Sequence, residues 1–297
     1  MVLPLAHFVG GTWAPVELLP PTAAIVAYAI RARSLAAQGR PVPVRKQLCF
    51  AVGMFLVYAA LVSPVAHLGG ELVLAHMVQH LLMADLGALL IVLGLTGPLL
   101  QPLLAVPYVG RLRVLANPAV ALPLWIVDLY AWHIPALYQA TLHSEAVHAL
   151  QHTSFVFFGI AMWMALFGPL PQPDWFGNGA KLLYIVGVRL AGALLGNVFI
   201  WSGTVFYPDY GGGDAYWDIS RLNDQGIAGT IMMIEGSIVT IVLFGWLFLK
   251  AAREAEERQN LLEYAESRGI DLSESRAARA VSAGRGAELR RRLEQSG

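Results

Sequence analysis

Residues 72–95 read LVLAHMVQHLLMADLGALLIVLGL, an apolar run of 24 residues that decides the fold class. A helix that crosses a bilayer needs about 20 mostly apolar residues, so this run predicts a membrane-spanning helix. The composition agrees, because 57% of the 297 residues are apolar and only 13% are charged, whereas a soluble domain has about 25% charged residues. An integral membrane protein is therefore expected. An ordinary cytosolic enzyme and a disordered or collagen-like chain are excluded.

Other apolar segments extend the prediction to the whole chain. Their ranges are 16–30, 47–65, 118–134, 147–166, 180–201 and 225–249. Residues 16–30 and 118–134 are the shortest of these segments, and each contains proline. Together with residues 72–95 they predict an all-α polytopic membrane protein with seven transmembrane helices.

Basic residues are concentrated in alternate loops of this predicted topology. Lys and Arg are enriched in cytoplasmic loops. The rich loops follow the first, third, fifth and seventh segments, and they contain Arg31, Arg33, Arg40, Arg45, Lys46, Arg111, Arg113, Lys181 and ten residues from Lys250 onward. The opposite loops contain only Arg221 among several aspartates. This alternation predicts an N-terminus outside the cell and a C-terminus in the cytoplasm.

The end of the chain has a different composition from the body. Residues 250–297 hold ten of the 20 basic and nine of the 20 acidic residues. We therefore predict a transmembrane domain at 1–250 and a cytoplasmic, charged, helical tail at 251–297, which is helical over 253–267 and partly disordered after Gly269. Because its charges nearly balance, nucleic-acid binding is not expected.

The N-terminus and the single cysteine add two exclusions. Residues 1–19 contain no Lys or Arg and so lack the basic region of a cleaved signal peptide. Cys49 is the only cysteine, so no disulfide can form within the chain, and we expect Cys49 to be a packing residue.

Histidine is the main chemical signal. Two predicted spans begin with the same H-x-x-Q-H pattern, with His76 and His80 in one and His148 and His152 in the other. Residues four apart lie on one face of a helix, one turn apart. Both spans enter from the outside, and His133 ends a span that runs outward. All five imidazoles are therefore predicted to lie at a similar depth in the outer half of the membrane.

This residue set suits a transition metal. Imidazole is the commonest biological metal ligand, and the thioether of methionine favours Cu(I). Met77 and Met83 flank the first histidine pair, and the last span carries two more methionines near the same level. A mixed site suits copper better than zinc. The predicted ligands are His76, His80, His148 and His152, with His133, Met232 and Met233 as secondary candidates.

Ionisable residues inside the predicted spans are also candidates for a function. Inserting each of them into a membrane costs about 2.5–3.5 kcal/mol, so their presence calls for an explanation. Asp85 and Asp128 lie in the third and fourth spans, and Arg189 and Glu235 lie near the middle of the sixth and seventh. We predict an Arg189–Glu235 structural pair. A proton path or an ion route is the alternative, and Glu235 could also orient a ligand of the metal site.

Several strings resemble one bacterial family. These are HMVQHLLM at 76–83, WHIPALY at 132–138, EAVHALQH at 145–152 and MMIEG at 232–236, with Asp224-Gln225 opening the last span. As a set they resemble the CtaG-type cytochrome c oxidase assembly factors, which are multispanning proteins. The resemblance implies a protein of the bacterial inner membrane that contacts oxidase subunits and supports their copper supply from the outer face. It adds Asp224 to the functional residues, and we expect no catalytic turnover.

Other functions remain open from the residues alone. A haem-binding electron carrier could use His80 and His152 as axial ligands. A proton-coupled transporter would use the four intramembrane charges, and a scaffold for oxidase subunits would need its histidines only for structure. A retinal protein is excluded because Lys46 and Lys181 lie at loop ends and Lys250 lies at the exit of the last span, so no lysine is placed to form a Schiff base. Nothing in a receptor's role calls for paired histidines. The oligomeric state is not determined by the sequence, and a homo-oligomer that shares the site between chains is compatible with it.

Overall fold

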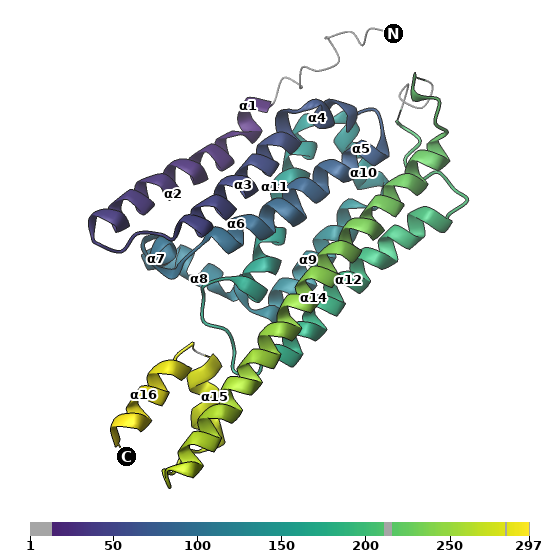
Figure 1. Cartoon of the computed structure of the whole chain (residues 1–297). Helices are drawn as coiled ribbons and strands as arrows, with labels where there is room; N and C mark the ends of the chain where they lie inside the picture. The colour runs from purple at the N-terminus through teal and green to yellow at the C-terminus, as the bar shows by residue number, and fades with distance from the viewer. Residues whose placement is uncertain (1–13, 211–215, 283, 297) are drawn as a thin grey trace. The chain divides into compact units, whose positions relative to one another are not determined.

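The computed structural model describes residues 14–210, 216–282 and 284–296 (Figure 1). Over these ranges the chain is helical and contains no strand, so the all-α prediction is confirmed. The elements are α1 (Ala14–Glu17), α2 (Leu19–Ala37), α3 (Val44–Val62), α4 (Pro64–Leu68), α5 (Val73–His80), the π-helix η2 (Leu81–Gly87), α6 (Ala88–Gly94), α7 (Gly97–Ala105), α8 (Pro107–Arg111), the 3-10 helix η3 (Leu112–Ala116), α9 (Pro118–Trp132), α10 (Pro135–His143), α11 (Glu145–Phe167), α12 (Asn178–Trp201), α14 (Arg221–Ser267), α15 (Glu274–Ser282) and α16 (Gly286–Ser296).

Several of these helices are long and apolar enough to cross a membrane. Among the described residues five qualify, and the number rises to seven if each of two bent pairs is one span. The five are α3, the continuous run Val73–Gly94, α11, α12 and α14. The multispanning prediction is therefore confirmed, with seven as the upper count. The orientation of the termini stays a prediction.

The two weaker predicted spans differ from the rest. The segment 118–134 is α9, which bends by 67° into Pro135–His143. The segment 16–30 falls on α1 and α2, and α2 is not among the five because its prolines and arginines lower its mean hydropathy. Even so, α2 lies alongside α3 (Figure 1), and the Tyr28 and Phe50 rings stack with centroids 3.8 Å apart.

The second bent pair lies in a predicted loop. Gly97–Ala105 and Pro107–Ala116 meet at 119°, and Pro107 begins the second helix, where its fixed φ and missing N–H are tolerated. The segment carries Arg111 and Arg113. A bend this sharp fits an elbow between α6 and α9 better than a straight crossing.

Close helix packing in the centre depends on glycine. A Cβ on Gly53 of α3 would lie 2.7 Å from the Ile91 amide nitrogen and 2.8 Å from the Gly87 carbonyl oxygen. A Cβ on Gly159 of α11 would overlap the Ala84 carbonyl oxygen in η2. Small residues at such positions let membrane helices approach closely. The π-helix is thereby held between α3 and α11.

We expect Gly159→Ala to destabilise the protein by about 1–3 kcal/mol, the usual range for overpacking, because rigid backbone faces the new methyl group. Gly192→Ala on α12 is the matched control, since nothing lies within 4 Å of a Cβ there. Thermal unfolding of both variants in detergent checks this. Equal midpoints for the two variants would contradict the close approach of α11 to η2.

The structure divides into two compact units, residues 1–238 and 239–297, with the boundary inside α14. In the second unit the end of α14 packs with α15 and α16 through Leu261, Val281, Leu289 and Leu293. After Gly269 the chain forms α15 and α16, whose apolar side chains share this small core despite the charged composition. Partial disorder of the tail stays a prediction.

Candidate metal-binding site

Four imidazoles, two from α5 and two from α11, lie against one another. The ring centroids of His76 and His80 are 4.3 Å apart, and those of His148 and His152 are 4.1 Å apart. Between the helices, His76 lies 5.2 Å from His148, and His80 lies 5.5 Å from His152. The structure therefore brings together the two pairs that the H-x-x-Q-H patterns singled out. We call these four residues the histidine cluster.

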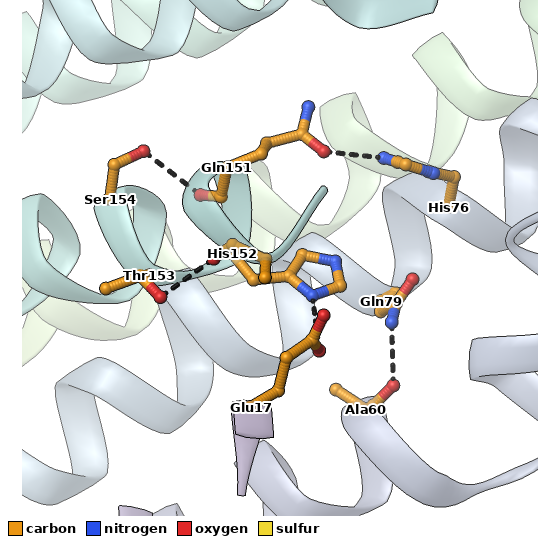
Figure 2. A network of polar contacts seen from close by, with 9 residues as sticks. Glu17, Ala60, His76, Gln79, Gln151, His152, Thr153 and Ser154 are labelled. Atoms are coloured by element: carbon orange, nitrogen blue, oxygen red, sulfur yellow. Dashed lines mark hydrogen bonds and ion pairs between the residues drawn. The ribbon is translucent and has the colours of Figure 1, made fainter. Parts of the chain in front are cut away.

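Hydrogen bonds fix the orientation of two of these rings. His152 Nδ1 lies 3.2 Å from Glu17 Oε2, as Figure 2 shows. His76 Nδ1 lies 3.2 Å from the Gly69 carbonyl oxygen. A carboxylate oxygen accepts hydrogen bonds, so in the neutral ring of His152 the proton lies on Nδ1 and Nε2 carries the lone pair. Both nitrogens of His76 face oxygen acceptors, and a neutral ring can donate to only one of them. Metal-binding histidines are oriented by contacts of this kind.

Several ring nitrogens in the cluster are buried without a hydrogen-bond partner among the described residues. They are both nitrogens of His80 and the Nε2 atoms of His148 and His152. His76 Nε2 has a neighbour, the Gln151 side-chain oxygen at 3.2 Å. A buried polar group without a partner costs about 1–3 kcal/mol, so several such atoms in one place call for an explanation such as a bound ion.

The distances between rings are compatible with ligation of one ion. Imidazoles bound tetrahedrally at about 2.0 Å have ring centroids about 5 Å apart, and five ring pairs of the cluster have centroid distances from 4.1 to 6.5 Å. As the side chains are arranged, however, no group of three or more His, Cys, Asp or Glu residues in the part of the chain that the structure describes could hold a metal ion. Ligation therefore requires the rings to rotate.

The fifth histidine, His133, is separated from the histidine cluster by aromatic side chains. His133 packs against Phe199 at 5.8 Å, Phe155 at 6.1 Å and Tyr138 at 6.2 Å. Its Nδ1 lies 2.6 Å from the Leu129 carbonyl oxygen, and its Nε2 is buried without a partner among the described residues. Aromatic side chains thus stand between His133 and the four clustered rings.

The methionines predicted as secondary ligands lie among other contacts. Met232 packs against the apolar cluster that contains Tyr138 and Phe199. The Met233 sulfur lies 3.6 Å from Asn197 Nδ2 and 3.8 Å from both terminal nitrogens of Arg189. Met233 therefore helps to join α12 to α14.

Three tyrosines cover the cluster on the side of the loop that follows α12. Tyr138 stacks on Tyr207 with centroids 3.7 Å apart, and its hydroxyl lies 2.9 Å from that of Tyr210. Tyr210 donates to the Gly69 carbonyl oxygen, which also faces His76. Burial raises the pKa of the Tyr207 and Tyr210 hydroxyls, so both remain protonated donors at neutral pH.

Asp224, in α14, places its carboxylate against the first backbone N–H groups of α5. Its two carboxylate oxygens accept from the backbone N–H of Val73 at 2.7 Å and of Leu74 at 2.9 Å. These N–H groups have no partner within their own helix. Asp224 therefore caps, from α14, the helix that carries His76 and His80.

The intramembrane charges pair differently from the prediction. Arg189 donates to the Met233 carbonyl oxygen at 3.3 Å and to Ser237 Oγ at 2.8 Å. Glu235 lies close enough to Arg189 and to Asp85 for their charges to interact. The hydrogen bonds of Arg189 go to Met233 and Ser237 rather than to Glu235, and Glu235 Oε1 has no hydrogen-bond partner among the described residues.

Two further contacts hold the remaining carboxylates in place. Asp85 lies in η2 and accepts from Trp163 Nε1 at 3.1 Å. Asp128 accepts from Trp132 Nε1 at 3.1 Å, and that indole also lies 2.6 Å from Ser154 Oγ. Asp85 therefore joins η2 to α11, and Asp128 holds the Trp132 indole that joins α9 to α11.

A sequence model of the family described as "Cytochrome c oxidase caa3 assembly factor (Caa3_CtaG)" matches residues 26–254. The chain belongs to this family. The match includes the histidine cluster, Asp224 and Glu235, and Glu17 lies outside it. Comparisons with characterised proteins and with solved structures give no match. The chain is thus a multispanning member of a cytochrome c oxidase assembly factor family.

The sequence analysis of this assembly-factor chain missed Glu17 and the three tyrosines. Glu17 is the only acidic residue among the first 70, and it lies at the start of the predicted span 16–30. A single acidic residue in an otherwise uncharged apolar segment could have marked Glu17 as a candidate functional residue. Tyr207 and Tyr210 lie in a loop whose path the sequence does not reveal.

Proposed function

We propose that this assembly factor binds copper transiently at His76, His80, His148 and His152 and passes it to an oxidase subunit from the outer face of the bacterial inner membrane. The observation that carries the proposal is the convergence of four imidazoles, three of which (His80, His148 and His152) have a buried nitrogen without a partner among the described residues. Copper is the cargo in this proposal, and the chain performs no catalytic turnover.

The donor set favours this cargo. Neutral imidazole suits copper, and a proton on Nδ1 of His152 leaves its Nε2 as the ligating atom. Because no three His, Cys, Asp or Glu side chains among the described residues could hold an ion as arranged, we expect the rings to rotate when copper binds.

The haem alternative fits the packing less well. The His80 ring packs on Phe155 at 4.6 Å and on His152 edge to face at 5.5 Å. A macrocycle between His80 and His152 would have to displace these contacts. A Soret band in the purified protein would decide for haem.

Elemental analysis of protein from copper-supplemented cells tests the proposal. Wild-type protein is expected to carry copper, and the His76→Ala/His80→Ala/His148→Ala/His152→Ala variant to carry almost none. His143→Ala is the control, because its exposed ring pairs with Asp209 at 2.7 Å, outside the histidine cluster. Equal copper in wild type and the four-histidine variant would remove the site.

Glu17→Gln should weaken copper binding by about 10–100-fold, the range found when the partner of a ligating histidine is changed. The carboxylate at His152 Nδ1 makes that ring a better ligand, and an amide does so less. Competition titration with a Cu(I) chelator measures the change, with Glu145→Gln as the control. An affinity equal to that of wild type would show that Glu17 does not act through His152.

A further inference from the structure

A cavity of about 290 Å³ lies between α2 and the adjoining faces of α3 and α11, and His152 of the histidine cluster borders it. Its walls are apolar and include Pro21, Ala24, Met54, Val57 and Val156. The volume is close to the lower end of small-molecule sites, about 300–1,000 Å³. The cavity can thus accept a hydrocarbon chain or a single ring, but not a whole phospholipid.

The side chains on one face of α2 explain why the cavity exists. Pro21, Ala24 and Tyr28 follow one another at helical spacing, so they face the same side. The first two are too small to fill the gap to α3. One turn further on, Tyr28 does fill it by stacking on Phe50 with ring centroids 3.8 Å apart. The cavity is therefore a slot beside α2 with Phe50 in its lining.

The slot also has a polar lining element. Glu17 and His152 line it, and both side chains are largely buried, at 14% and 6% exposed. Glu17 uses Oε2 to hold His152 Nδ1, which leaves Oε1 to accept a hydrogen bond from something else. A carboxylate at this place attracts a hydroxyl donor and repels a phosphate or carboxylate head group. A permanently charged group would also be costly in so apolar a slot.

We propose that this cavity binds a neutral membrane amphiphile, with its hydrocarbon tail in the slot and a hydroxyl head group that donates to Glu17. The two sources of this chemistry in a membrane are a quinol and an acylglycerol. The proposal goes beyond copper binding and does not depend on it, since the slot and its carboxylate are present whether or not the histidine cluster holds an ion.

The experiment measures binding to the full-length protein in detergent micelles by native mass spectrometry. The probes are a benzoquinol with a decyl tail, monoolein as the acylglycerol and oleate as an anionic amphiphile. Ala24→Phe fills the slot, and Ala23→Phe is the matched control because Ala23 does not line it.

Wild type and Ala23→Phe are expected to bind a neutral probe at least tenfold more tightly than Ala24→Phe does, and to prefer it to oleate. Preference for the quinol or for monoolein identifies the source, and either supports the proposal. Equal binding by Ala23→Phe and Ala24→Phe, or preference for oleate, would overturn it. The Ala24→Phe variant should contain as much copper as wild type. Binding of the neutral probes is measured separately from copper content, so this test keeps its meaning even if the protein binds no copper.

Discussion

His80→Leu is expected to lower the oxidase activity of cells that depend on this protein by at least tenfold while leaving the protein as stable as wild type or more so. Both nitrogens of His80 are buried without a partner among the described residues. Replacing such a group by an apolar one of similar size is neutral or stabilising. Loss of function without loss of stability would therefore identify His80 as a ligand.

Oxidase activity in a strain deleted for the gene measures the first effect, and thermal unfolding of the purified variant measures the second. His143→Leu is the control, since it changes an exposed histidine. Full oxidase activity with His80→Leu would show that the histidine has only a packing role. Partial recovery of activity in excess copper would connect the defect to copper supply.

Asp224→Ala is expected to destabilise the protein by about 2–4 kcal/mol and to lower its copper content. The substitution leaves the Val73 and Leu74 N–H groups without their acceptor at the start of the helix that carries His76 and His80. Each buried donor without a partner costs about 1–3 kcal/mol, and the loss of a helix cap costs a similar amount.

Thermal unfolding and elemental analysis of the same preparations measure both effects. Asp224→Asn keeps one side-chain oxygen and should lie between Asp224→Ala and wild type. Asp209→Ala, at a more exposed side chain, is the control for loss of a carboxylate. An Asp224→Ala variant as stable as wild type would contradict the capping role.

The parts of the site that local spacing determines could be predicted from the sequence. His76 and His80 share a helix face because they are four apart, and the same holds for His148 and His152. Two spans that enter from one side then place both pairs at a similar depth. The structure shows these rings 5.2 and 5.5 Å apart between the helices.

Contacts that depend on long-range packing could not be predicted in this way. Glu17 reaches His152 from 135 residues away. The π-helix at Leu81–Gly87 changes the angular position of Asp85, so a count based on regular helix spacing does not reveal that it lies near Glu235. Arg189 was paired with Glu235 by charge alone, whereas its hydrogen bonds go to Met233 and Ser237.

X-ray absorption spectroscopy of the Cu(I)-loaded protein tests the central claim most directly, because it reports the ligands of the metal itself. We expect two or more imidazole nitrogens at about 2.0 Å from copper, and loss of this signal in the four-histidine variant. A copper shell without imidazole scattering, or the same spectrum from wild type and variant, would contradict it.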